Sequence, residues 1–290
     1  MNQQRKIQRI IQPEYVIEGA GVLLRRSISP HASNKFDPFL LFDHFAFNDP
    51  IEGPIRGFPM HPHRGIETVT YMLEGSTHHR DSLGNAGLIG PGDVQWMTSG
   101  RGILHEEMPR RGPNGTIYGF QLWVNLPAAL KMTTPRYQEV SAATIPSVEK
   151  DGATVRIVTG EVFDVKGPVT EIAANPLYID VTLTPGAEFT QETPLGHTVI
   201  AYVFEGAGTL GSTEFGSGEP EMVSAVKMVV FADGDHIRVK AAENSPLRFM
   251  LIAGAPFKEP IVPYGPFVMN TVEEIQQTLM DLRSGAFVQQ

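Results

Sequence analysis

Two short histidine-containing segments in the first half of the chain have the spacing of metal ligands. They are His61-Pro62-His63 and His105-Glu106-Glu107. In a β-strand, residues i and i+2 point to the same face, so His61 converges with His63, and His105 converges with Glu107. Two such strands that face one barrel interior supply three imidazoles and one carboxylate. That set suits a divalent first-row metal ion and leaves coordination sites open for a substrate or O₂.

The fourth ligand is not decided by spacing alone. Glu107 has the strand parity of His105, whereas Glu106 points to the other face. Glu67 follows His63 with the same strand parity and is an equally good candidate. Pro62 has no backbone N–H to give to a ladder, which places the first pair at a strand start or at a sheet edge.

The composition predicts the kind of scaffold that positions these residues. A chain of 290 residues suggests two domains, and its 41% hydrophobic and 19% charged residues are those of an ordinary globular protein. With 29 Gly and 23 Pro between short apolar runs, turn-dense β architecture is favoured. One helix is expected at about 271–284, where Thr271 and Glu274 have the spacing of a capping box and Gly285 suits the position after the last turn.

A weak internal repeat indicates that the β architecture is duplicated. Tyr71–Gly75 (YMLEG) recurs as Tyr202–Gly206 (YVFEG), and Pro91-Gly92-Asp93 is echoed by Asp233-Gly234-Asp235. A strand, a glycine turn, a Gly-Asp turn and a further strand, occurring twice, predict two β-sandwiches or barrels. At the offsets of the four candidate ligands, the second half has Glu192, Pro194, Leu247 and Phe249, and it contains no HxH or HxE, so one metal site is expected rather than two.

The polar stretch from about 131 to 152 is predicted to link the halves. We therefore expect an N-terminal domain at 1–140 with the metal site, and a C-terminal domain at 141–290 that includes the helix. Among the other histidines, His78-His79 is predicted to lie in a solvated turn after Gly75. His44, His197 and His236 have no partner at ligand spacing and are predicted to be structural.

Several classes of function are disfavoured by composition. The chain has no cysteine, which removes disulfides, thiolate catalysis and Cys-ligated zinc. The formal net charge of −9 argues against direct nucleic-acid binding and against binding to an anionic membrane. Residues 1–6 lack an apolar segment after their charges, and no run is long enough to span a bilayer. We expect a cytoplasmic protein.

Four long strings resemble those of the pirin family of two-domain cupins. The likeness runs from about 37 to 285 and is carried by His61–Thr68 (HPHRGIET), by Gly92–His105 with Glu107 and Pro109, by Gln121–Leu126 (QLWVNL) and by Tyr264–Thr271 (YGPFVMNT). The resemblance implies an all-β bicupin, with two jelly-roll β-barrels and one short C-terminal helix. The segment between Glu67 and Gly75 is longer than in the general cupin pattern, and Thr98-Ser99-Gly100 replaces its PxG, which puts Glu67 in doubt as a ligand.

The resemblance also implies which residues act and what they do. It implies that one mononuclear metal, most often Fe(II) with Mn, Ni, Co or Cu as alternatives, is held by His61, His63, His105 and Glu107. It implies Glu67 as a group that orients a histidine, Glu107 as the catalytic base or proton relay, and Phe58, Asp43 and Gln121 as substrate-binding residues. Two functions are implied: a quercetin 2,3-dioxygenase-type oxidoreductase that cleaves flavonols with O₂ and releases CO, or a non-catalytic iron-dependent regulator acting through a protein partner.

Overall fold

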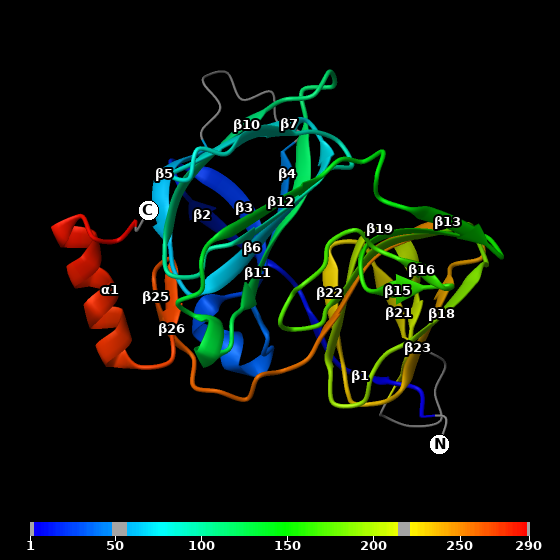
Figure 1. Cartoon of the computed structure of the whole chain (residues 1–290). Helices are drawn as coiled ribbons and strands as arrows, with labels where there is room; N and C mark the ends of the chain where they lie inside the picture. Colours follow the sequence, from blue (N-terminus) through cyan, green and yellow to red (C-terminus); the bar gives the residue numbers. More distant parts are fainter. Residues whose placement is uncertain (1–2, 48–56, 214–220, 289–290) are drawn as a thin grey trace. The chain divides into compact units, whose positions relative to one another are not determined.

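The described part of the chain is all-β apart from two short 3-10 helices and one C-terminal α-helix. The computed structural model describes residues 3–47, 57–213 and 221–288 (Figure 1). The chain forms two cupin units, each assembled from two stretches of sequence. The N-terminal cupin unit comprises Glu14–Ala142 with Phe257–Gln290, and the C-terminal cupin unit comprises Met1–Pro13 with Ala143–Pro256.

The units differ from the expected domains at 1–140 and 141–290, because each end of the chain belongs to the unit formed mainly by the other half of the sequence. Strand β1 (Lys6–Ile11) pairs antiparallel with β22 (Lys227–Phe231), so the first residues belong to the C-terminal unit. Strands β25 (Val262–Tyr264) and β26 (Phe267–Met269) and helix α1 (Val272–Ser284) belong to the N-terminal unit. The helix has the predicted capping box and a left-handed Gly285, but it packs on β26 through Phe267, Met269, Ile275 and Phe287.

Two large sheets form most of the N-terminal cupin unit, in addition to the two-stranded sheet of β25 and β26. A seven-stranded sheet has the order β12-β9-β6-β11-β4-β3-β2, and a four-stranded sheet has the order β5-β10-β7-β8. Their strands are β2 (Glu14–Glu18), β3 (Val22–Ile28), β4 (Phe39–Phe47), β5 (Phe58–His63), β6 (Ile66–Glu74), β7 (Ser76–Asp81), β8 (Ala86–Ile89), β9 (Val94–Thr98), β10 (Ile103–Arg110), β11 (Ile117–Asn125) and β12 (Arg136–Val140). The 3-10 turns are η1 (Pro30–Lys35) and η2 (Ala128–Leu130).

A glycine separates β5, the strand that carries the first histidine pair, from β6, the next strand along the chain. Gly65 lies between β5 and β6 with a φ of 78°, in the left-handed region that a side chain disfavours. A Cβ at this position would lie 2.2 Å from the carbonyl oxygen of Val268, so no larger residue fits. Because the backbone turns here, the side-chain alternation of β5 does not continue into β6.

The C-terminal cupin unit has a large hydrophobic core. This core is built from the inward residues of an 11-stranded sheet and includes Val181, Phe189, Val239 and Phe249. The strands, besides β1 and β22, are β13 (Ser147–Lys150), β14 (Ala153–Thr159), β15 (Glu161–Val162), β16 (Val165–Lys166), β17 (Leu177–Leu183), β18 (Glu188–Glu192), β19 (Thr198–Leu210), β20 (Ser212–Thr213), β21 (Met222–Ser224), β23 (His236–Ala241) and β24 (Leu247–Gly254).

Strand pairing tests the internal repeat directly. The YMLEG and YVFEG strings lie on β6 and β19, and β6 lies between β9 and β11 as β19 lies between β22 and β24. The second match is wrong. Asp233-Gly234-Asp235 precedes β23, which pairs with β18 and β19 as β10 pairs with β5 and β7. The counterpart of the His105 strand is therefore β23, not the strand of Leu247 and Phe249, and its buried residues are Ile237, Val239 and Ala241.

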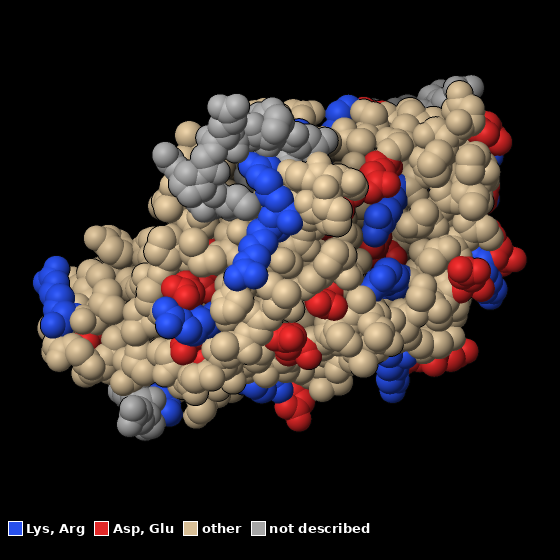
Figure 2. Space-filling model, turned by 90° about the horizontal axis from the view of Figure 1, so that it is seen from above, with Lys and Arg blue, Asp and Glu red and all other residues tan. Residues whose placement is uncertain are grey.

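Charge on the molecular surface is mixed. On the face in Figure 2, basic and acidic side chains are interspersed and most of the surface carries neither. Within the described residues, no helix is long and apolar enough to cross a membrane.

Candidate metal centre and pocket

Three histidines from two antiparallel strands converge inside the N-terminal cupin unit. His61 and His63 lie on β5, and His105 lies directly opposite His61 on β10. One ring nitrogen from each lies within 4.8 Å of the other two. Among the described residues this is the one group of histidines and carboxylates close enough to hold a metal ion.

Backbone carbonyls fix the tautomers of two of these rings. The Nδ1 atom of His61 lies 2.9 Å from the carbonyl oxygen of Pro59, and the Nδ1 atom of His63 lies 3.2 Å from that of Pro266. A carbonyl oxygen only accepts hydrogen bonds, so each Nδ1 carries the proton. In a neutral imidazole the Nε2 atom then has a free lone pair. The Nε2 atoms of His61 and His63 nevertheless lie 3.1 Å apart.

Two facing lone pairs repel each other, and a cation that both nitrogens can coordinate would stabilise them. Burial lowers the pKa of all three histidines, that of His63 to about 3, so the rings are neutral at pH 7. His105 is fully buried, and neither of its ring nitrogens has a hydrogen-bond partner in the described structure. Two imidazole ligands at right angles on a first-row metal place their nitrogens roughly 3 Å apart. The cluster therefore fits a metal ion on its geometry and its unpartnered donors.

Glu107 is near this cluster but outside it. It lies on β10 opposite Phe58, after a register shift that follows His105. Its Oε1 atom accepts a 2.8 Å hydrogen bond from the hydroxyl of Thr70. Burial raises the pKa of Glu107 to about 7, so the carboxyl is poised to take or release a proton near neutrality.

Glu67 does not orient a histidine in this structure. Its carboxyl group accepts hydrogen bonds from the indole N–H of Trp96 (3.1 Å) and from the hydroxyl of Thr98 (2.7 Å). Glu67 is paired in register with Thr98, whereas Thr70, which contacts Glu107, has the opposite parity on β6. The parity argument that linked Glu67 to His63 was wrong, because the turn at Gly65 separates the two strands.

A pocket of about 400 Å³ opens beside the histidines. His61, His63 and Glu107 line it on one side. The sequence-predicted Phe58, Asp43 and Gln121 all line it as well, together with Leu24, Leu41, Phe45 and Trp123. The wall is thus largely apolar and aromatic, with polar groups at a few positions, which is typical of a site for a small aromatic ligand.

A row of four polar side chains runs across the seven-stranded sheet, and three of them, Arg26, Asp43 and Gln121, line the pocket. Arg26, Asp43, Gln121 and Thr70 are aligned in register on four adjacent strands. Arg26 donates two hydrogen bonds to the Asp43 carboxylate, at 2.8 and 2.7 Å, and a third to Glu18. Thr70 contacts both the amide oxygen of Gln121 (2.9 Å) and Glu107. Arg26 was not identified from the sequence, because its role depends on the pairing of β3 with β4.

Two further interior residues were missed for a different reason. His79, predicted to lie in a solvated turn, is fully buried on β7 opposite Glu107, and Asp81 is buried opposite His105. Their nearest side-chain nitrogen and oxygen lie 3.5 Å apart. Gly75 alone forms the turn (φ 71°), and β7 begins at Ser76. The signal was present, since His79 and Asp81 have the same i, i+2 spacing as the metal candidates.

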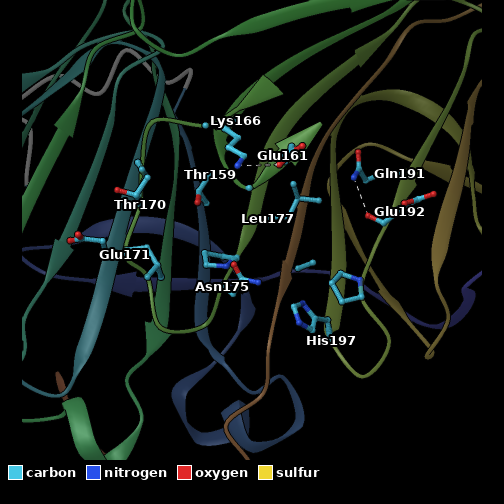
Figure 3. Close-up of a pocket in the computed structure, with 17 residues that line it drawn as sticks. Thr159, Glu161, Lys166, Thr170, Glu171, Asn175, Leu177, Gln191, Glu192 and His197 are labelled. Atoms are coloured by element: carbon cyan, nitrogen blue, oxygen red, sulfur yellow. Dashed lines mark hydrogen bonds and ion pairs between the residues drawn. The ribbon is translucent and has the colours of Figure 1, made fainter. Parts of the chain in front are cut away.

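The C-terminal cupin unit has a separate cavity of about 640 Å³ (Figure 3). Its lining mixes polar with apolar residues; the polar ones include Glu161, which forms an ion pair with Lys166, and Glu192, whose carbonyl accepts a hydrogen bond from Gln191. His197 lines it without a second histidine nearby. The cavity contains no group of metal-binding side chains among the described residues.

Comparison with known proteins identifies the family. Models described as pirin and as the pirin C-terminal cupin domain match residues 21–124 and 178–288. A pirin-like protein of Solanum lycopersicum is 46% identical over 92% of this chain and 88% of its own. Pirin of Homo sapiens is 43% identical with the same coverage. The chain belongs to the pirin family. This pirin is also similar to the solved structure of a quercetin 2,3-dioxygenase from Acinetobacter baumannii, with 34% identity, a TM-score of 0.85 and 98% of each chain covered.

Proposed function

We propose that this pirin is a metal-dependent dioxygenase that cleaves flavonols such as quercetin with O₂ and releases CO. The observation that carries the proposal is the pair of Nε2 atoms 3.1 Å apart, whose Nδ1 atoms both face carbonyl oxygens. Its position beside an aromatic-lined pocket connects the metal centre to a substrate. The similarity to a quercetin 2,3-dioxygenase supports the choice of reaction.

His61, His63 and His105 would hold the metal, and Glu107 is the fourth candidate ligand. A bound Fe(II), or another divalent first-row ion, acts as a Lewis acid and as a template for O₂ and the deprotonated substrate. Three neutral imidazoles leave the net charge of the ion largely uncompensated, which favours an anionic substrate oxygen at the site.

The residues of the pocket account for the other requirements. Phe58 and Trp123 offer ring faces to a planar aromatic molecule. Asp43, held by Arg26, and Gln121 offer acceptors to phenolic hydroxyl groups. Glu107, with its pKa raised to about 7 by burial, can accept the proton of the reacting hydroxyl, while the donor Thr70 holds its carboxylate in place.

The experiment compares turnover with metal binding. The purified protein is loaded anaerobically with Fe(II), and O₂ uptake and CO release are followed after addition of quercetin and air. We expect equal uptake and release in the wild type, and loss of both in Glu107→Gln, which should retain the metal because its three clustered histidines are unchanged.

Absence of turnover in the metal-loaded wild type would contradict the dioxygenase proposal. That result would favour the alternative function, a metal-dependent regulator that acts through a protein partner, since the curated relatives are named as pirins rather than as enzymes.

A further inference from the structure

We infer that the C-terminal segment 262–287 positions His63, so that docking of α1 and metal binding at the histidine cluster are thermodynamically coupled. The inference rests on the proposed metal centre and is independent of which substrate is used. The segment comes after the C-terminal cupin sequence along the chain but belongs to the N-terminal cupin unit. Figure 1 shows α1 beside β25 and β26.

The first connection is the direct hydrogen bond to a candidate ligand. The Pro266 carbonyl faces the Nδ1 atom of His63 at 3.2 Å and fixes the tautomer in which Nε2 points to the cluster. Pro266 lies in the turn between β25 and β26, and Pro263, Gly265 and Pro266 also line the pocket. One wall of the site is therefore built by the stretch of chain that leads into β26 and α1.

The second connection is the side chain of Arg64, the residue next to His63. Its side chain is 1% exposed. The guanidinium donates hydrogen bonds to the carbonyl of Arg101 (2.5 Å), the hydroxyl of Thr278 (3.2 Å) and the carboxylate of Asp281 (2.7 Å). It also lies over the ring of Phe287 at 4.6 Å. Two of these partners are on α1, so the helix anchors the residue directly after the ligand.

The third connection joins the backbones of the same segments. The carbonyl of Arg64 accepts the N–H of Val268 at 3.1 Å. The buried ammonium of Lys131 donates to the carbonyls of Gly65 and Val268, both at 2.8 Å, and to the amide oxygen of Asn125. These three acceptors use all three donors of the lysine. The turn after His63 is thus tied to β26 by backbone and side-chain bonds together.

Coupling is a consequence of these contacts. A helix of the length of α1 is marginal in water by itself, so it is helical because it is docked. Undocking removes the Arg64 anchors and frees the Pro266 carbonyl from His63. Metal binding, which needs His63 in place, must then favour the docked state by the same factor by which docking favours metal binding.

The first test needs no variant. Hydrogen exchange of the α1 amides is measured in the full-length wild type with and without saturating Co(II), a spectroscopically visible divalent ion. We expect exchange of the α1 amides to slow by about tenfold or more with Co(II), while exchange in the C-terminal cupin unit stays unchanged. Equal exchange with and without Co(II) would overturn the inference.

The second test compares two charge reversals on the same helix. Asp281→Arg places a second guanidinium against the buried Arg64, whereas Glu273→Arg changes an exposed residue in the first turn. We expect Asp281→Arg to weaken Co(II) binding by about 10–100-fold, the range for groups that orient metal ligands, and Glu273→Arg to stay within about twofold of the wild type. Equal affinities in a folded Asp281→Arg protein would contradict coupling.

The outcomes separate the two proposals. Coupled Co(II) binding without quercetin turnover would leave this inference standing and remove the dioxygenase function. A wild type that binds no Co(II) would remove the metal centre and the coupling with it.

Discussion

The carbonyls of Pro59 and Pro266 give the histidine cluster its chemical character. By accepting hydrogen bonds from the Nδ1–H groups of His61 and His63, they leave both Nε2 lone pairs facing each other in a buried space. Such an arrangement costs free energy unless a cation is present, as buried unpaired polar groups generally do. Two backbone carbonyls therefore favour metal binding at this site, and a side-chain substitution does not remove a backbone carbonyl.

Replacing a candidate ligand tests this character most directly. We expect His105→Ala to weaken Fe(II) or Co(II) binding by more than about 100-fold, because it removes one of three imidazoles from the cluster. The matched control is His78→Ala, since His78 lies on the adjacent strand with the parity opposite to that of buried His79. Metal content and Co(II) titration measure both. Retention of affinity in His105→Ala would show that the ion binds elsewhere.

The raised pKa of Glu67 makes a prediction about stability. Burial raises this pKa to about 7 from an ordinary value of 4.5, so the protonated carboxyl is the form that suits the fold. Its contribution is fully present below pH 4.5 and is lost as the pH rises to about 7. Between pH 5 and 8, Glu67→Gln should therefore lose ~2 kcal/mol less unfolding free energy than the wild type.

Urea unfolding of the metal-free protein at the two pH values measures this difference. Glu139→Gln, at a surface position of β12, is the control. Parallel pH dependences in Glu67→Gln and the wild type would mean that Glu67 ionises normally.

The pocket residues are expected to affect substrate binding more than chemistry. Phe58→Ala removes a ring face that lines the pocket, and we expect KM for quercetin to rise about 10-fold with a smaller change in kcat. Phe163→Ala, in the C-terminal cupin unit, is the control. A fall in kcat at unchanged KM would show instead that Phe58 positions the reacting groups.

Strand geometry decided which site residues could be predicted from the sequence. The pairing of i and i+2 held for His61 with His63 because β5 is continuous across them. It failed for Glu67, since the left-handed φ of Gly65 begins a new strand. The same rule was not applied to His79 and Asp81, because Gly75 was taken to start a longer turn than it does.

Long-range pairing limits what the sequence predicts about the elements. The capping box of α1 is a local pattern and was predicted with its start correct, because Thr271 and Glu274 interact within one turn. The unit to which α1 belongs depends on Arg64 and Asp281, which are distant in sequence, and no local pattern reports such a contact. The position of Arg26 beside Asp43 likewise depends on the register of β3 on β4, which no local pattern reports.

The two cupin units differ in what fills them. Where β10 of the N-terminal unit carries His105 and Glu107, the corresponding strand β23 presents Ile237 and Val239 to an apolar core. Burying hydrocarbon there stabilises the unit, whereas the buried imidazoles and carboxyl of the other unit cost stability until they are paired or bound to an ion. The C-terminal unit is thus stabilised by its apolar core, whereas the N-terminal unit contains the polar site.

This division predicts that stability and metal binding can be separated by mutation. Phe249→Ala truncates a fully buried ring in the C-terminal core and should cost about 3–5 kcal/mol of unfolding free energy. Co(II) affinity at a temperature well below unfolding should remain within about twofold of the wild type, because the three clustered histidines and the residues that line the 400 Å³ pocket belong to the other unit. Phe120→Ala, an equally buried ring on β11 beside Gln121, should reduce both. Calorimetry and Co(II) titration on the same samples measure the two quantities, and loss of Co(II) affinity in a folded Phe249→Ala protein would mean that the C-terminal core supports the metal centre after all.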